Sequence, residues 1–234
     1  RALSYRRLYI GRIFRNPAAK LDTFFRALAT AFDNPNCPAE VLALRNEARA
    51  NHLQSWSFQE FAQGETELGQ KHLRQAVELI RTSIANAEDK IRRALVYFAV
   101  RDGGDHEAIL RKIFAQVPAE MEWLAKNCDW AVARGYLVRG TRDIMWGRLE
   151  QGHQHFAYAE KLHAQVDESF LRGLTDQLLN FQMEFGTEAA DQVLRSWTEC
   201  LEEIGAQGQV RWLKGCYSIN RSFKDYQAGQ YARV

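Results

Sequence analysis

Apolar residues recur every three or four positions along most of the chain, which is the spacing of one buried face of an α-helix. The clearest case spans residues 187–205, where the repeating apolar set comprises Ala190, Val193, Leu194, Trp197, Leu201 and Ile204. We expect this stripe to pack in a core rather than to bind a cofactor. The sequence has no alternating runs of β-branched residues, and Pro118 is the only proline after Pro38. The pattern therefore predicts an all-α chain.

The same spacing places the individual helices. Asn16 and Pro17 begin the first one, whose apolar residues continue to Phe32, with proline in its favoured first turn. The turn-rich segment DNPNCP follows at 33–38, and a long helix is expected from there to Gln63. Further helices are expected at roughly 65–85, 88–101, 105–116, 119–127, 129–151, 153–167, 169–185, 187–205 and 208–228.

Glycines interrupt this helical pattern at intervals. Gly64 is expected to close one helix in the left-handed conformation. Glycine within a helix costs roughly 1 kcal/mol relative to alanine, so we expect Gly69 to lie where two helix backbones touch. Further glycine stops are predicted at Gly103, Gly152, Gly186 and Gly229. Ala108 and Ala157 follow two of these stops by five residues and are expected at the same kind of helix contact as Gly69.

One of these hairpins resembles a known repeat. Trp56, Gly64, Gly69, Leu73 and Ala76 form a pattern that resembles the tetratricopeptide repeat. The chain departs from that pattern because no repeat has the closing proline, except where Pro118 falls, and Lys161 replaces an expected apolar residue. The resemblance implies a right-handed array of antiparallel helix hairpins, about four to five of them, over residues 17–234.

Composition narrows the class of protein. The formal net charge of +2 gives no broad positive field for nucleic acid, and no run of apolar residues approaches the length of a membrane span. The four cysteines form no C-x-x-C pair, which predicts reduced thiols in a cytoplasmic protein.

The first segment has a composition of its own. Residues 1–15 are rich in arginine, contain aromatic residues and lack acidic ones. They suit either peripheral contact with an anionic membrane or, as we favour, a connector over 1–16 that packs on a preceding domain. Because the sequence begins at Arg1 and ends shortly after Gly229, where another helix should follow, we expect a fragment of a longer polypeptide.

Motifs of catalysis and metal binding do not emerge from the sequence. GYLVRGT at 135–141 has the glycine spacing of a phosphate loop but lacks its lysine. His153 and His155 would point about 200° apart on a helix, so they cannot face one metal together. Paired acids such as Glu202 and Glu203 suit helix ends and polar faces. We therefore predict no catalytic residue, no cofactor and no metal.

A binding groove is the remaining candidate site. In tetratricopeptide arrays the first helix of each hairpin lines a concave face, and the glycine register assigns residues to it. They are Asn51, Phe58, Lys90, Arg93, Tyr97, Arg139, Arg142, Trp146, Asp176 and Asn180. Arginines beside aromatic residues would bind an acidic peptide or a carboxylate. The alternatives are a solvated face of mixed charge, or arginines that cap or flank neighbouring helices.

A wider resemblance concerns the parent protein. The segments YRRLYIGRIFRNP and AFDNPNCP, the helix from Arg45 to Ala50, and SINRSFKDYQAGQY are similar to helical tails of some bacterial family 2 glycosyltransferases. The resemblance implies a non-catalytic appendage that positions an acceptor, a partner or the parent catalytic domain, since the D-x-D motif of that family is missing from this sequence. A stand-alone adaptor or sensor for acidic peptides, and a small helical enzyme with a scattered site, stay open as alternatives. The sequence does not indicate whether the chain is a monomer or an oligomer.

Overall fold

The computed structural model describes residues 17–82, 86–101 and 104–227. Every regular element in these ranges is helical, which confirms the all-α prediction. Across the described ranges, no helix combines the length and the apolar character that a membrane crossing requires. The basic segment 1–16 and the predicted stops Gly103 and Gly229 lie outside the described residues, so their roles stay predictions.

The chain divides into two compact units by its internal contacts. Unit 1 extends to Phe98 and also includes Lys112–Ala125, whereas unit 2 comprises Ala99–Arg111 and the residues from Lys126 onward. The boundary therefore passes through two helices, α6 (Ala87–Val100) and α7 (His106–Phe114).

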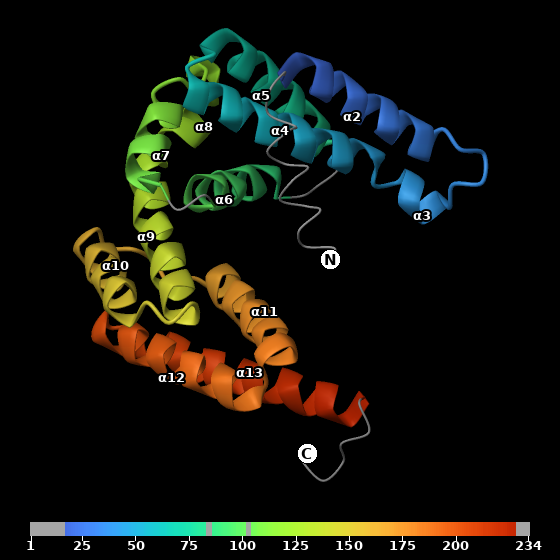
Figure 1. Cartoon of the computed structure of the whole chain (residues 1–234). Coiled ribbons are helices and arrows are strands. Elements are labelled where there is room, and N and C mark those ends of the chain that lie inside the picture. Colours follow the sequence, from blue (N-terminus) through green and yellow to red (C-terminus); the bar gives the residue numbers. More distant parts are fainter. Residues whose placement is uncertain (1–16, 83–85, 102–103, 228–234) are drawn as a thin grey trace. The chain divides into compact units, whose positions relative to one another are not determined.

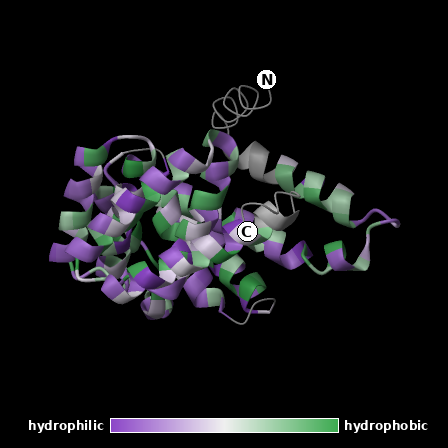
Figure 2. Ribbon diagram, turned by 90° about the horizontal axis from the view of Figure 1, so that it is seen from below, coloured by the Kyte–Doolittle hydropathy of each residue, from purple (hydrophilic) through white to green (hydrophobic). Residues whose placement is uncertain are grey.

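The remaining elements follow in chain order (Figure 1). Those of unit 1 are α2 (Pro17–Phe32), α3 (Ala39–Leu42), α4 (Arg45–Gln63), α5 (Thr66–Arg81), the 3₁₀ helix η1 (Ala119–Met121) and α8 (Glu122–Ala125). Those of unit 2 are α9 (Cys128–Met145), α10 (Leu149–Lys161), α11 (Glu168–Phe185), α12 (Thr187–Glu203) and α13 (Gln207–Gln227). Hydrophilic and hydrophobic residues alternate around individual helices (Figure 2), as expected of helices that bury one face.

Helices α4 and α5 form the central hairpin of unit 1. Gly64 ends α4 with φ of 90°, which confirms its predicted left-handed conformation. Gly69 is buried, and a Cβ atom there would lie 2.6 Å from the ring of Phe61. Close helix packing at Gly69 is therefore confirmed, but the neighbour is the Phe61 side chain rather than the backbone of α4 that we expected. Phe58 is only 1 % exposed and packs against Phe98, so its predicted position on a groove is wrong.

Helices α9 and α10 form the corresponding hairpin of unit 2, and here the predicted register is wrong. The chain leaves α9 at Gly147, whose φ is 76°, and Gly152 lies within α10. The expected single helix over 129–151 is therefore two helices. A Cβ at Gly152 would lie 3.1 Å from the carbonyl oxygen of Gly140, so these two backbones touch. Gly147 therefore makes the turn that was predicted for Gly152, and Gly152 makes the contact between helices.

The same shift removes the two predicted alanine contacts. Ala108 and Ala157 are both exposed, so the expectation that they lie at close helix–helix contacts is wrong. In α10 the buried alanine is Ala159, which is fully inaccessible. It follows Gly147 by twelve residues, as Ala76 follows Gly64.

Helices α11, α12 and α13 complete unit 2. Gly186 separates α11 from α12 with φ of 90°, which confirms that predicted stop. The apolar stripe of α12 is largely core, as predicted: Ala190, Val193, Trp197 and Leu201 are buried. Trp197 also donates a hydrogen bond from Nε1 to the Thr141 carbonyl, 2.9 Å away, which holds α12 to α9.

Candidate functional site

Three of the predicted groove residues of unit 1 lie along α6. Lys90 forms an ion pair with Glu47 of α4, and Arg93 pairs with Asp89 one turn earlier at 2.7 Å. Tyr97 is exposed. Positions 90, 93 and 97 share one face of a helix, yet both cations already have an acidic partner. This face of α6 is therefore of mixed charge.

The predicted groove residues of unit 2 lie mainly on α9. Arg142 donates to the carbonyl oxygens of Val100 and Arg101, at 2.6 and 3.5 Å, and Arg139 donates to that of Gly104 at 3.1 Å. Cations at the C-terminal end of a helix satisfy its free carbonyl groups. The Arg142 contacts are those of the capping alternative, because Val100 ends α6, whereas Gly104 precedes α7, so Arg139 flanks a helix instead of capping one.

Asn51 of α4 and Asp176 of α11 are exposed, and two further members of the set lie at the surface of unit 2. Trp146, the residue at the end of α9, is 59 % exposed, and Asn180 of α11 is exposed. Because the set is divided between the two units, its convergence on one surface stays a prediction.

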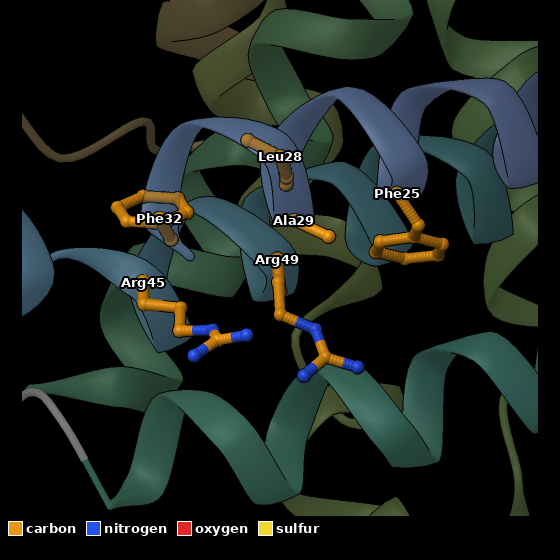
Figure 3. A pocket seen from close by; sticks show the side chains of 6 residues that line it. All are labelled: Phe25, Leu28, Ala29, Phe32, Arg45 and Arg49. Carbon is orange, nitrogen blue, oxygen red and sulfur yellow. The ribbon is translucent and has the colours of Figure 1, made fainter. Parts of the chain in front are cut away.

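A pocket in unit 1 brings together arginine and aromatic side chains. It lies between α2 and α4, has a volume of about 250 Å³, and is lined by Phe25, Leu28, Ala29, Phe32, Arg45 and Arg49. The arginines are four residues apart on α4 and extend their guanidinium groups to the same side (Figure 3). One wall is apolar and contributed by α2, and the other is cationic and contributed by α4.

The two arginines differ in their surroundings. Arg45 donates to the exposed carboxylate of Asp33 at 2.8 Å. Arg49 makes no ion pair with any described residue, and its guanidinium carbon lies 5.6 Å from the centre of the Phe25 ring. Arg49 is therefore the cation of this pocket that lacks a counter-charge within the described part of the chain.

An aromatic cluster joins α2 and α4 next to the pocket. His52 stacks on Phe24 with ring centres 3.4 Å apart, and it accepts a hydrogen bond from Trp56 Nε1 at 2.7 Å. Burial lowers the pKa of His52 to about 4, so the ring is neutral at pH 7. A neutral imidazole can accept this hydrogen bond, which lies within α4, while the stacking of its ring on Phe24 joins α4 to α2 beside the arginines.

A buried acid–histidine pair is the feature that sequence reasoning missed. Glu60 of α4 and His72 of α5 are both buried, with His72 Nδ1 2.8 Å from a carboxylate oxygen. In unit 2, Asp143 of α9 faces His155 of α10 at 3.2 Å. Both pairs bridge the two helices of a hairpin.

The two hairpins match residue by residue at an offset of 83 positions. Glu60, Gly64, Gly69, His72 and Ala76 correspond to Asp143, Gly147, Gly152, His155 and Ala159. Comparing the chain with itself would have found this signal. In each hairpin, one glycine with positive φ makes the turn, and a second glycine five residues later lies at a close contact between the helices. The acid and the histidine of the pair lie on opposite sides of this turn.

Unit 2 carries a further polar cluster around Tyr136. The Tyr136 hydroxyl donates to Glu107 at 2.9 Å, and its ring packs edge-on against buried His106. Burial, followed by the hydrogen bond to Glu107, raises the pKa of Tyr136 to about 12. Burial and the charges of Arg139 and His155 lower the pKa of His106 to about 4. The Nε2 atom of His106 has no hydrogen-bond partner among the described residues, so this neutral ring is held by packing.

One group of side chains in the described part of unit 2 could hold a metal ion: His153, Cys200 and Glu203. His155, two residues from His153, faces Asp143 instead. The two histidines thus have different partners, as their helical spacing predicts. Burial, followed by the charges of two neighbouring glutamates, raises the pKa of the Cys200 thiol to about 12.

Comparison of the chain with family models, with curated proteins and with solved structures gives no match. The resemblances to tetratricopeptide repeats and to glycosyltransferase tails therefore stay predictions. Function is inferred below from the geometry of each unit.

Proposed function

We propose that this chain is a non-catalytic helical interaction module that binds an acidic segment of a protein partner. The pocket between α2 and α4 is the observation that carries the proposal. It offers two guanidinium groups one helical turn apart and a wall of phenylalanine side chains. Guanidinium groups bind carboxylates through paired hydrogen bonds, and the apolar wall covers the stem of an acidic side chain.

The charge distribution within the pocket favours an anionic occupant. Arg49 has no ion pair among the described residues, and Asp33, the partner of Arg45, is exposed and can be displaced. An exposed ion pair contributes little to stability, typically below about 1 kcal/mol. A carboxylate between the two arginines would therefore replace a weak contact by two charge-assisted ones.

The other polar groups support a scaffold rather than an active site. The Glu60–His72 and Asp143–His155 pairs lie inside hairpins. Arg139 and Arg142 bind backbone carbonyls. These side chains are engaged in holding helices together, which leaves surface recognition as the function best matched to the fold.

The parent protein is a second part of the proposal. The resemblance of the sequence to glycosyltransferase tails favours an appendage that positions an acceptor or a partner, or that contacts the catalytic domain of its own enzyme. A stand-alone adaptor would use the same pocket. In either case the ligand chemistry is an acidic side chain or a terminal carboxylate.

Binding of a fluorescent glutamate-rich peptide, followed by anisotropy, tests the proposal. Wild-type protein should bind this peptide more tightly than a lysine-rich peptide of equal length, and affinity should fall with salt because exposed charges are screened. Arg49→Gln should weaken binding about tenfold, as expected for losing a charge-assisted hydrogen bond.

A matched control is available in unit 2, where Arg211→Gln removes an exposed arginine. This variant should bind like the wild type, and the melting temperatures of both variants should stay close to the wild-type value. Equal affinity of wild type and Arg49→Gln for the acidic peptide would contradict the proposal.

A further inference from the structure

His153, Cys200 and Glu203 form a cluster of three different metal-binding side chains on two helices of unit 2. His153 lies on α10, and Cys200 and Glu203 lie on α12. One potential ligand atom from each residue lies within 4.8 Å of the other two. The cluster does not overlap the arginine pocket, whose residues all belong to unit 1.

The two separations measured from the histidine nitrogen are close to edges of a tetrahedral zinc site. His153 Nδ1 lies 3.5 Å from Cys200 Sγ and 3.5 Å from a carboxylate oxygen of Glu203. With ordinary zinc–ligand bond lengths, a tetrahedron separates sulfur from nitrogen by about 3.6 Å and nitrogen from oxygen by about 3.3 Å. The same histidine nitrogen serves both edges, and the sulfur and the carboxylate oxygen lie within 4.8 Å of each other.

The backbone holds the three residues in place. Cys200 and Glu203 are three residues apart, so they share one face of α12. That helix is tied to α9 by the hydrogen bond from Trp197. His153 follows Gly152, where α10 touches the backbone of α9. Both helices that supply ligands are therefore fixed against the same third helix.

The exposed fraction of the side chains increases from Cys200 through His153 to Glu203, as expected of a site that is open to solvent on one side. Cys200 is fully buried, the His153 side chain is 41 % exposed, and that of Glu203 is 63 % exposed. An ion held here would have the thiolate on its protein side and room for water on its solvent side.

We propose that His153, Cys200 and Glu203 bind a zinc ion, with water as the fourth ligand. A thiolate, an imidazole and a carboxylate together favour zinc over magnesium or calcium, which prefer oxygen ligands. On binding, the thiol of Cys200 loses its proton to solvent and its sulfur forms the bond to zinc. The ion joins α10 to α12 and thereby stabilises unit 2.

Cobalt titration of the full chain, stripped of metal with a chelator, tests the site. Co²⁺ should give the visible absorption of a tetrahedral ion together with a thiolate charge-transfer band, and added Zn²⁺ should remove both signals. Zn²⁺ should also raise the melting temperature and release about one proton per chain near neutral pH, from the thiol.

Variants assign the ligands. Cys200→Ser should abolish the charge-transfer band, whereas the control Cys216→Ser should retain it. His153→Gln alters a part-exposed side chain and should keep the fold while weakening Co²⁺ binding at least about tenfold; His163→Gln is its control. A charge-transfer band that survives Cys200→Ser, or Co²⁺ affinity that is unchanged in folded His153→Gln, would overturn the proposal. The remaining contact would then be a hydrogen bond between Cys200 and His153.

Discussion

Three hairpins of this chain have the same type of turn but differ in the pair of side chains that bridges their two helices next to the turn. In α4–α5, α9–α10 and α12–α13 the turn glycine is left-handed, with φ of 90°, 76° and 79°. The amide after each of these glycines donates to a carbonyl five residues earlier at 2.8 Å, which is the Schellman arrangement. Behind the first two turns lies an acid–histidine pair. In α12–α13 the same positions hold Leu201 and Leu213, both fully buried.

The comparison shows that the turn does not require the polar pair. The hairpins also differ at the fifth residue after the stop, which is Gly69 or Gly152 in the polar hairpins and Val210 in the apolar one. The missing Cβ leaves room for the Phe61 ring at Gly69 and for the Gly140 carbonyl group at Gly152, and in both hairpins the acidic side chain reaches histidine across the two helices. The pair and the close contact are therefore parts of one arrangement, seen in α4–α5 of unit 1 and in α9–α10 of unit 2.

The largest effect is expected from breaking one pair. Glu60→Leu leaves His72 buried beside leucine without its partner, and loss of one member of a buried pair costs about 3–5 kcal/mol. Urea unfolding followed by circular dichroism measures this change. Adding His72→Leu, which copies the Leu201–Leu213 hairpin, should recover most of the loss because well-packed apolar residues can replace a buried pair.

Glu78→Leu, an exposed change on α5, is the matched control and should alter the free energy of unfolding by less than about 0.5 kcal/mol. If the double variant were no more stable than Glu60→Leu, the leucine hairpin would not be a valid guide to the polar ones.

A pH effect of somewhat smaller size is expected in unit 2. The pKa of His106 is about 4 in the folded chain and about 6.5 in the unfolded one, so the unfolded state binds more protons between these values. Stability contributed by neutral His106 is present above pH 6.5 and lost as the pH falls toward 4, by about 2–3 kcal/mol. His106→Gln should flatten the fall in unfolding free energy over this range; an unchanged slope would place the titration elsewhere.

Glycine contacts provide a third, smaller test. A Cβ at Gly152 would lie 2.5 Å from Ile144 and 3.1 Å from the Gly140 carbonyl oxygen, so Gly152→Ala should destabilise the chain by about 1–3 kcal/mol. The exposed Ala157 should tolerate leucine with a change below about 0.5 kcal/mol. Thermal melts of the two variants distinguish the observed register from the one predicted from sequence. The predicted register would make Ala157→Leu the more destabilising of the two.

The smallest expected loss concerns the arginines of α9. Arg142→Ala removes its hydrogen bonds to the Val100 and Arg101 carbonyls, which should cost about 1 kcal/mol. If the acidic peptide binds to the arginines of α4, this substitution on α9 should leave the affinity for the peptide unchanged. Weakened binding at unchanged melting temperature would support the groove predicted from sequence.

Local sequence signals account for much of the fold. Helical periodicity predicts α2, α11 and α12 closely, and Gly64 and Gly186 end helices where predicted. The register failed at Gly147 and Gly152 because either glycine suits a turn, and only the packing of α10 on α9 decides which one makes it.

The candidate sites depended on contacts between helices, which local patterns do not encode. Glu60 and His72 are twelve residues apart on different helices, where each looks like an ordinary polar surface residue. His153 and Cys200 are separated by 47 residues. The pocket was missed because Arg45 and Arg49 form it only together with Phe25 and Phe32 of α2, and the packing of α2 on α4 cannot be read from local sequence.

The central claim is that recognition belongs to the arginine pocket and that the buried pairs serve only the fold. Titration of the labelled glutamate-rich peptide into wild type, Arg45→Gln/Arg49→Gln and Glu60→Leu/His72→Leu tests it most directly. The pocket variant should lose at least about tenfold in affinity, whereas the pair variant, once shown to be folded, should bind like the wild type. Retained binding by the pocket variant together with loss in the folded pair variant would contradict the claim.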